Sequence, residues 1–129
     1  MNIRIHHAAI WTANLERLKS FYVTQLGAVA GEKYANPKKG FQSYFLSFAS
    51  GPGLEIMTSD KLTCGGAESP SPGYAHISLS VGSEAEVDAL TERLRSTGTP
   101  VVDGPRRTGD GFYESAVLDP DGNHIEITV

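Results

Sequence analysis

The sequence predicts an α+β protein made of two βαβββ modules, because one pattern of strand and helix signals occurs twice in its 129 residues. In each copy, a histidine in a strand-like segment, His7 or His76, lies 7 residues before a residue that favours helix N-caps. In each copy, a glycine that can end the helix lies 28 residues before a glutamate, Glu55 or Glu126. Two equivalent modules would therefore each present a histidine and a glutamate at matching places.

The first module begins with a strand over residues 3–11, in which alternation places His7 on the same face as the large apolar side chains. A helix over 15–26 follows, because leucine and tyrosine recur there at helical spacing between Asn14, a good N-cap, and Gly27, a good stop. Three further strands are predicted over residues 28–34, 41–49 and 54–58.

The second module repeats this order after a linker over 60–74 that is rich in glycine, serine and proline. Ser83 and Glu86 have the spacing of a capping box, which opens the second helix, and Gly98 ends it. The strands of this module are predicted over residues 75–81, 100–102, 112–118 and 124–129.

Length and composition indicate one compact domain, with module one over about 1–59, the linker over 60–74 and module two over about 75–129. A net charge of −4 and a pI of about 5.5 argue against nucleic-acid and acidic membrane partners. No apolar run approaches the ~20 residues that span a bilayer, and the N-terminus lacks the apolar core of a signal peptide. The lone Cys64 cannot form an intrachain disulfide, so a reducing, cytoplasmic location is expected.

The four repeated side chains, His7, Glu55, His76 and Glu126, are of the types that hold a divalent metal ion. Imidazole and carboxylate suit zinc, nickel, cobalt, manganese and ferrous iron, whereas calcium sites are nearly all oxygen. Each glutamate lies among apolar strand residues, where an unpaired charge facing a core would be costly. The alternative is an open sheet with both glutamates on its wet face and with hydrogen-bonded structural histidines. The occurrence of all four at duplicated spacing favours the metal site.

Three segments of the chain resemble the glyoxalase I, bleomycin-resistance and extradiol-dioxygenase superfamily. They are residues 7–15 with the following Phe21-Tyr22 and Leu26-Gly27, residues 75–81, and residues 119–126. The resemblance covers nearly the whole chain and implies the vicinal-oxygen-chelate fold, a mixed, mostly antiparallel arrangement of eight strands around a cleft. It also implies a twofold homodimer, because members of this family commonly pair their modules between chains.

Within this family, the number of protein ligands to the metal separates the chemistries. Extradiol dioxygenases and thiol transferases use three, which correspond here to His7, His76 and Glu126. Glyoxalase I uses four, and Glu55 stands at the fourth place in this chain. The resemblance therefore implies a metal-dependent lyase or isomerase similar to lactoylglutathione lyase, with one divalent ion, nickel or zinc before cobalt, manganese or iron. The metal would stabilise an enediolate, with Glu126 as the general base and Glu55 able to serve from the opposite side.

Two other classes stay open. A ferrous extradiol-type dioxygenase or a thiol transferase would use three of the four ligands, and a metal-free binding protein of the bleomycin-resistance type would use none. Intact residues at all four places count against the pure binder, and less against the dioxygenase. Where bacterial glyoxalases carry an arginine that helps to hold glutathione, this chain has Trp11. The resemblance therefore implies a small-molecule substrate, but Trp11 at this place does not favour glutathione as the thiol that forms part of it.

Four further residues are candidates for a place near the predicted site. Arg106 and Arg107 lie in a glycine-rich loop over 104–111 that has the composition of a movable lid, and their guanidinium groups could clamp a substrate carboxylate or phosphate. Solvated surface arginines are the more common case. His124 shares strand parity with the second glutamate and could line the pocket, whereas His6 has the parity opposite to its neighbouring histidine and is expected to be unrelated to the metal.

Overall fold

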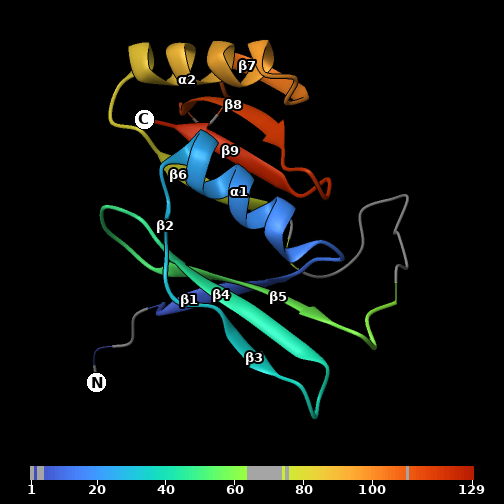
Figure 1. The fold of residues 1–129 in the computed structure, drawn as a ribbon. Coiled ribbons are helices and arrows are strands. Elements are labelled where there is room, and N and C mark those ends of the chain that lie inside the picture. Colours follow the sequence, from blue (N-terminus) through green and yellow to red (C-terminus); the bar gives the residue numbers. More distant parts are fainter. Residues whose placement is uncertain (1, 3–4, 64–73, 75, 110) are drawn as a thin grey trace. The chain divides into compact units, whose positions relative to one another are not determined.

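The computed structural model describes residues 2, 5–63, 74, 76–109 and 111–129 (Figure 1). The chain forms two compact units, residues 1–66 and 67–129, whose boundary falls within the predicted linker. Each unit contains one helix and one sheet; the second has the βαβββ order that the repeated sequence pattern predicts, and the first has the same order with one additional strand. The α+β class predicted from the sequence is therefore confirmed.

The sheet of the first unit has five strands, with β1, β5, β4 and β2 in that spatial order and β3 also paired to β4. β1 and β5 are parallel, and the other pairs are antiparallel. The elements of this unit are β1 (His7–Trp11), α1 (Leu15–Leu26), β2 (Val29–Ala30), β3 (Tyr34–Asn36), β4 (Phe41–Ser47) and β5 (Gly53–Ser59).

Helix α1 has the predicted bounds because both of its caps are present. The Asn14 side chain accepts a hydrogen bond from the Arg17 backbone N–H at 3.0 Å, and Gly27 closes the helix with a left-handed φ of 71°. The Tyr44 hydroxyl on β4 donates to Glu16 of this helix at 3.0 Å. The core of the unit lies between α1 and one face of the sheet, and its buried side chains are Leu15, Leu18, Phe21, Tyr22, Tyr44, Leu46, Leu54 and Ile56.

The sheet of the second unit has four strands in the order β6, β9, β8 and β7, with β6 parallel to β9. Its helix opens where the capping box predicts, because Ser83 Oγ accepts a hydrogen bond from the Glu86 backbone N–H at 3.2 Å. The helix ends just before Gly98, which has a φ of 90°. The elements are β6 (His76–Ser80), α2 (Glu84–Ser96), β7 (Val101–Arg107), β8 (Tyr113–Leu118) and β9 (His124–Thr128).

Helix α2 packs on one face of this sheet, and the opposite face carries His76, Glu126 and other residues that lie outside the core. Thr91 on the helix and Ser115 on β8 are both buried, and their hydroxyls share a hydrogen bond of 2.6 Å. That bond satisfies two polar groups that would otherwise be costly to bury. The fully buried apolar side chains around them are Val87, Leu94, Val117, Ile125 and Ile127.

Two sequence predictions about the strands are wrong in detail. The predicted strand over 28–34 is divided into β2 and β3, so the described residues contain nine strands where eight were expected. The first half of the predicted lid over 104–111 is not a loop, because β7 runs through Arg107 and pairs with β8. Gly104 and Pro105 fit into this strand at register shifts, and a methyl group on Gly104 would overlap the Glu114 carbonyl oxygen.

The structure also bears on the predicted absence of a membrane segment. Among the described residues, neither helix has the length and apolar character needed to cross a bilayer.

Candidate metal centre and adjoining pocket

The strand register places the predicted ligands of each unit on one sheet face. In the first unit, parallel pairing sets His7 opposite Gly53 and Ala9 opposite Glu55. His7 and Ala9 are two residues apart, so their side chains point the same way, and Glu55 shares that face. The histidine and glutamate are therefore neighbours on adjacent strands, one alternation step apart.

The second unit repeats this register. His76 pairs with His124, and Ser78 pairs with Glu126, so the glutamate again lies two residues beyond the partner of the histidine. The His76 Nε2 and Glu126 Oε2 atoms are 3.2 Å apart, and the two side chains are 43% and 28% exposed. An imidazole nitrogen and a carboxylate oxygen at this separation can serve one ion.

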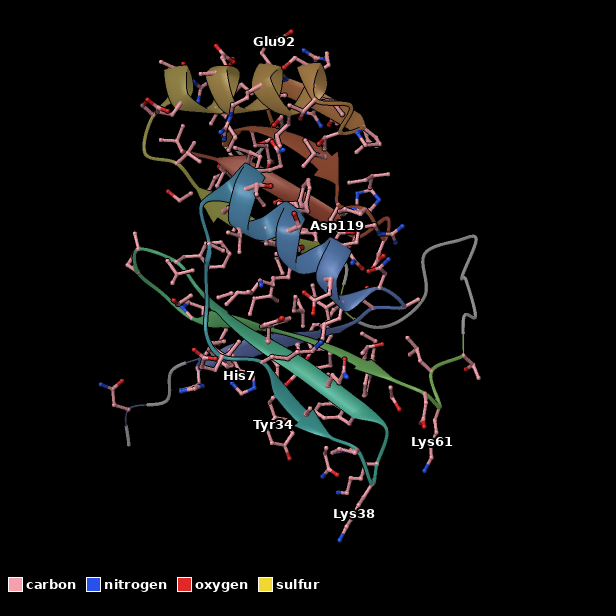
Figure 2. All side chains as sticks on the ribbon, in the orientation of Figure 1. His7, Tyr34, Lys38, Lys61, Glu92 and Asp119 are labelled. Carbon is pink, nitrogen blue, oxygen red and sulfur yellow. The ribbon has the colours of Figure 1, made fainter. Side chains whose placement is uncertain are left out.

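The first unit has no corresponding contact between His7 and Glu55. The Nδ1 atom of His7 instead lies 2.8 Å from Nδ1 of His6 at the start of β1, where Figure 2 labels His7. With His7 donating this hydrogen bond, its Nε2 remains an acceptor that can bind a metal. His6 was expected to be unrelated to the metal, and its contact with His7 could not be foreseen from strand parity.

Phe45 closes one side of the His7 and Glu55 pair. It lies opposite Glu55 in the pairing of β4 with β5, and its ring meets the His7 ring edge-on, with centroids 5.3 Å apart. A methyl group on Gly53 would overlap the Phe45 ring, so this ring lies over the glycine that faces His7 across the sheet. The first histidine is thus held between an aromatic ring and a second imidazole.

Both glutamates lie on the sheet faces opposite the helices. The residues flanking Glu55, Leu54 and Ile56, point into the core, as does Ile125 beside Glu126. The glutamates therefore lie on the open faces of their sheets and not in a core. The cost of burying an unpaired charge does not apply to them, so it does not by itself indicate a metal. Within either unit, no three histidine, cysteine, aspartate or glutamate side chains of the described residues converge as a metal site.

The two arginines considered as a substrate clamp are engaged within the second unit. Arg106 Nη2 forms an ion pair with Asp103 at 2.8 Å. Arg107 forms one with Glu84 and also donates to the Gly111 carbonyl at 3.1 Å. Because these ion pairs already occupy the guanidinium groups, the structure gives no support to the clamp.

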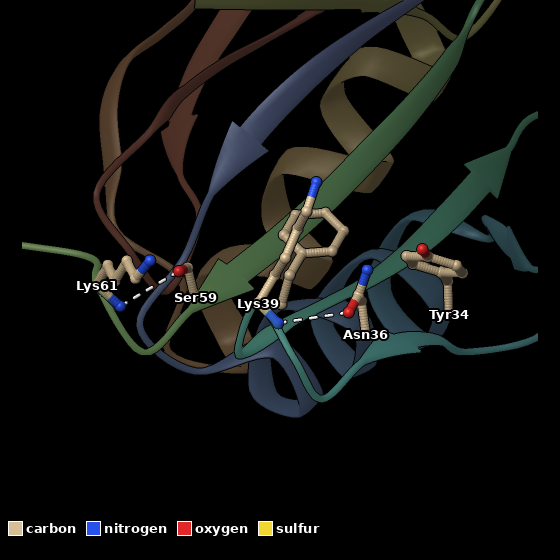
Figure 3. A pocket seen from close by; sticks show the side chains of 6 residues that line it. Tyr34, Asn36, Lys39, Ser59 and Lys61 are labelled. Carbon is tan, nitrogen blue, oxygen red and sulfur yellow. Dashed lines mark hydrogen bonds between the residues drawn. The ribbon is translucent and has the colours of Figure 1, made fainter.

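A pocket that the sequence did not indicate lies on the same sheet face as His7 and Glu55. Its volume is about 490 Å³, and Figure 3 shows its side chains gathered at the end of β5. The pocket is formed by side chains on the paired strands β3, β4 and β5 and by the loop from β3 to β4. These side chains are distant in sequence, and strand pairing brings them together. The lining residues are Tyr34, Asn36, Lys39, Phe41, Ser59 and Lys61.

Residues 4–127 match the family described as the glyoxalase/bleomycin resistance protein/dioxygenase superfamily. The chain belongs to this superfamily. Its members include glyoxalase I and many other enzymes, and they commonly use a divalent metal ion. The family resemblance predicted from three segments of the chain is therefore confirmed. No sequence among the curated proteins matches the chain.

Solved structures agree with the superfamily assignment. A glyoxalase family protein from Enterococcus faecalis is 28% identical with a TM-score of 0.79, over 97% of this chain and 96% of that one. The trypanothione-dependent glyoxalase I of Leishmania major is 26% identical with a TM-score of 0.78, over 98% of this chain and 86% of that one. A superfamily domain from Frankia sp. EAN1pec has a TM-score of 0.85 at 18% identity, over 100% of this chain and 98% of that one, which shows the fold alone.

Proposed function

We propose that the protein is a metal-dependent lyase or isomerase resembling lactoylglutathione lyase. The observation that carries this proposal is the repeated register, in which both units set a glutamate two residues beyond the strand partner of a histidine. A sheet that only needed a polar open face would have no reason to keep the same two residue types at the same two positions in both units. Glyoxalase I structures among the neighbours of the chain support the class of reaction.

The chemistry of the donor set fits a divalent ion. Two imidazoles and two carboxylates from His7, Glu55, His76 and Glu126 neutralise a dication and suit nickel or zinc, with cobalt, manganese or iron as alternatives. Each unit supplies two of these four groups. When bound, the ion would act as a Lewis acid toward a substrate carbonyl.

The side chains of the protein would carry out the proton transfer. Glu126 is the proposed general base, which takes a proton from the carbon next to the carbonyl and returns one to its neighbour. His76 Nε2 lies 3.2 Å from Glu126 Oε2, so the base is proposed to act beside this imidazole on the open face of the sheet. Glu55 is proposed to accept or return the proton from the opposite side of the substrate, beside the Phe45 ring.

Metal analysis followed by an activity assay tests this proposal. The purified protein is expected to contain about one divalent ion per chain. After removal of the metal, added nickel or zinc is expected to restore activity on a hemithioacetal. A folded protein that takes up no divalent ion would contradict the metal centre. Metal uptake with oxygen consumption on a catechol, and no reaction of a hemithioacetal, would favour the dioxygenase.

We also propose a twofold homodimer as the functional assembly. The ligand-bearing face of the first unit leaves large aromatic side chains exposed, with Trp11 at 51%, Tyr34 at 54% and Phe45 at 38%. A second copy of the chain could cover part of this face. Sedimentation at micromolar concentration is expected to give a dimer, and a monomer under those conditions would contradict the proposal.

A further inference from the structure

The polar side chains of the pocket beside β5 offer hydrogen-bond donors, and two of their oxygen atoms already accept from backbone N–H groups. Asn36 Oδ1 accepts from the Lys39 N–H at 3.3 Å, and Ser59 Oγ accepts from the Lys61 N–H at 3.2 Å (Figure 3). The Asn36 amide hydrogens and the Ser59 hydroxyl hydrogen remain as donors, and the lysine ammonium groups can only donate. A ligand with acceptor atoms can use all of these donors.

The charge of the pocket is positive. No ion pair joins Lys39 or Lys61 to another residue that the structure describes. The neighbouring Asp60 carboxylate lies against Gly40, where a methyl group would overlap it, and it is not within ion-pair distance of either ammonium group. Two cations and a set of donors indicate an anionic ligand.

An aromatic wall completes the pocket. The Tyr34 and Phe41 rings meet with centroids 6.0 Å apart, and the Phe41 ring also meets Trp11 at 6.2 Å. Rings arranged in this way favour flat apolar groups, which gain contact area and aromatic interactions. The volume of about 490 Å³ is large enough for a small organic molecule.

We propose that this pocket binds an aromatic carboxylate. The ring of the ligand lies against Phe41 and Tyr34, and its carboxylate lies between the ammonium groups of Lys39 and Lys61. The two ammonium groups and the neighbouring donors favour the anion, and the aromatic wall favours the flat body. This binding site is defined by the first unit alone and requires no metal.

The pocket also bears on the substrate class, a step that rests on the proposed function. Glu55 and Ser59 are four residues apart on β5 and share a face, which corresponds to about 13 Å along the strand. A substrate whose carbonyl reacts beside Glu55 could therefore place a carboxylated aromatic end in the pocket. The substrate is then a carbonyl compound with an aryl carboxylate arm of that reach.

Binding is tested on the full chain with 2-naphthoate as the probe and the neutral 2-naphthalenemethanol as its isostere. Chemical-shift titration is expected to show saturable binding of the carboxylate, with shifts at residues 34–41 and 59–61, and much weaker binding of the alcohol. Lys39→Gln and Lys61→Gln should each weaken naphthoate binding by about fivefold, and the double variant by about tenfold or more, because exposed charge pairs contribute modestly. Added salt should weaken it further.

Lys38→Gln is the matched control, because Lys38 lies in the same loop as Lys39 and does not line the pocket. Figure 2 labels Lys38 at the tip between β3 and β4. This variant should leave naphthoate affinity unchanged. Equal losses in Lys38→Gln and Lys39→Gln, or full binding by the double variant, would overturn the proposal. Saturable binding of inorganic phosphate at these residues without binding of naphthoate would overturn it as well.

Steady-state kinetics separate this inference from the proposed function. On a hemithioacetal of a carboxylated aryl aldehyde, Lys39→Gln and Lys61→Gln should raise KM severalfold and leave kcat unchanged, whereas the hemithioacetal of an uncharged aldehyde should show no change. If the protein has no isomerase activity but still binds naphthoate through these lysines, the proposed binding pocket is supported and the proposed substrate class is wrong. An active isomerase whose KM for the carboxylated substrate ignores both lysines would overturn that assignment.

Discussion

Replacing His76 with alanine is expected to lower the affinity of the protein for its divalent ion by more than about 100-fold, because losing even an indirect partner of a metal ligand costs ~10–100-fold. The missing imidazole would have to be replaced by water, and Glu126 would lose its neighbour at 3.2 Å. Competition with a chromogenic chelator measures the affinity, and thermal unfolding with and without metal measures the accompanying loss of stabilisation.

His124→Ala is the matched control for this variant. His124 lies directly opposite His76 in the strand pairing and has the same ring, but it is not among the proposed ligands. Its removal should leave metal affinity within about twofold of the wild type, an allowance set by the usual small effect of exposed substitutions. Wild-type metal content and stability in His76→Ala would show that the proposed ligand set is wrong.

The sequence predicted those parts of the fold that depend on local chemistry. Helix α1 begins and ends at the predicted residues because Asn14 and Gly27 act within one turn of the helix ends. The duplicated spacing predicted that both units place a histidine and a glutamate at matching positions, and the strand register repeats in this way. Periodicity and caps are properties of neighbouring residues, so a single sequence reveals them.

Features that depend on strand pairing could not be predicted in the same way. Gly104 and Pro105 indicated a loop, but pairing with β8 accommodates them in β7 at shifts of register. The pocket joins Tyr34 to Ser59, which are distant in sequence and share no motif. The contact between His6 and His7 depends on the backbone before β1, where strand alternation no longer applies. For Gly104, Pro105 and the pocket, the missing information was which residues pair across the sheet.

Replacing Glu55 with glutamine is expected to separate the isomerase from the dioxygenase. The change keeps the shape of the side chain and removes its charge and basicity, and positioned general bases typically contribute about 10²–10⁴-fold to rate. In an isomerase that uses Glu55 as a ligand and proton carrier, exchange of the substrate hydrogen next to the carbonyl with solvent should slow by about 10²-fold. The exchange rate is measured by isotope incorporation from heavy water, with both proteins folded and loaded with metal.

In a dioxygenase that uses three ligands, Glu55 would be accessory, so the same variant should retain oxygen-dependent cleavage of a catechol. Glu32→Gln makes the same chemical change at an exposed position of the first unit and should leave both activities unchanged. If the wild-type protein exchanges no hydrogen on any hemithioacetal or α-hydroxycarbonyl substrate, yet consumes oxygen with a catechol, the isomerase proposal is wrong and the dioxygenase is favoured. Because Glu55 lies on the open face of its sheet, loss of exchange in a folded Glu55→Gln protein would report on chemistry and not on packing.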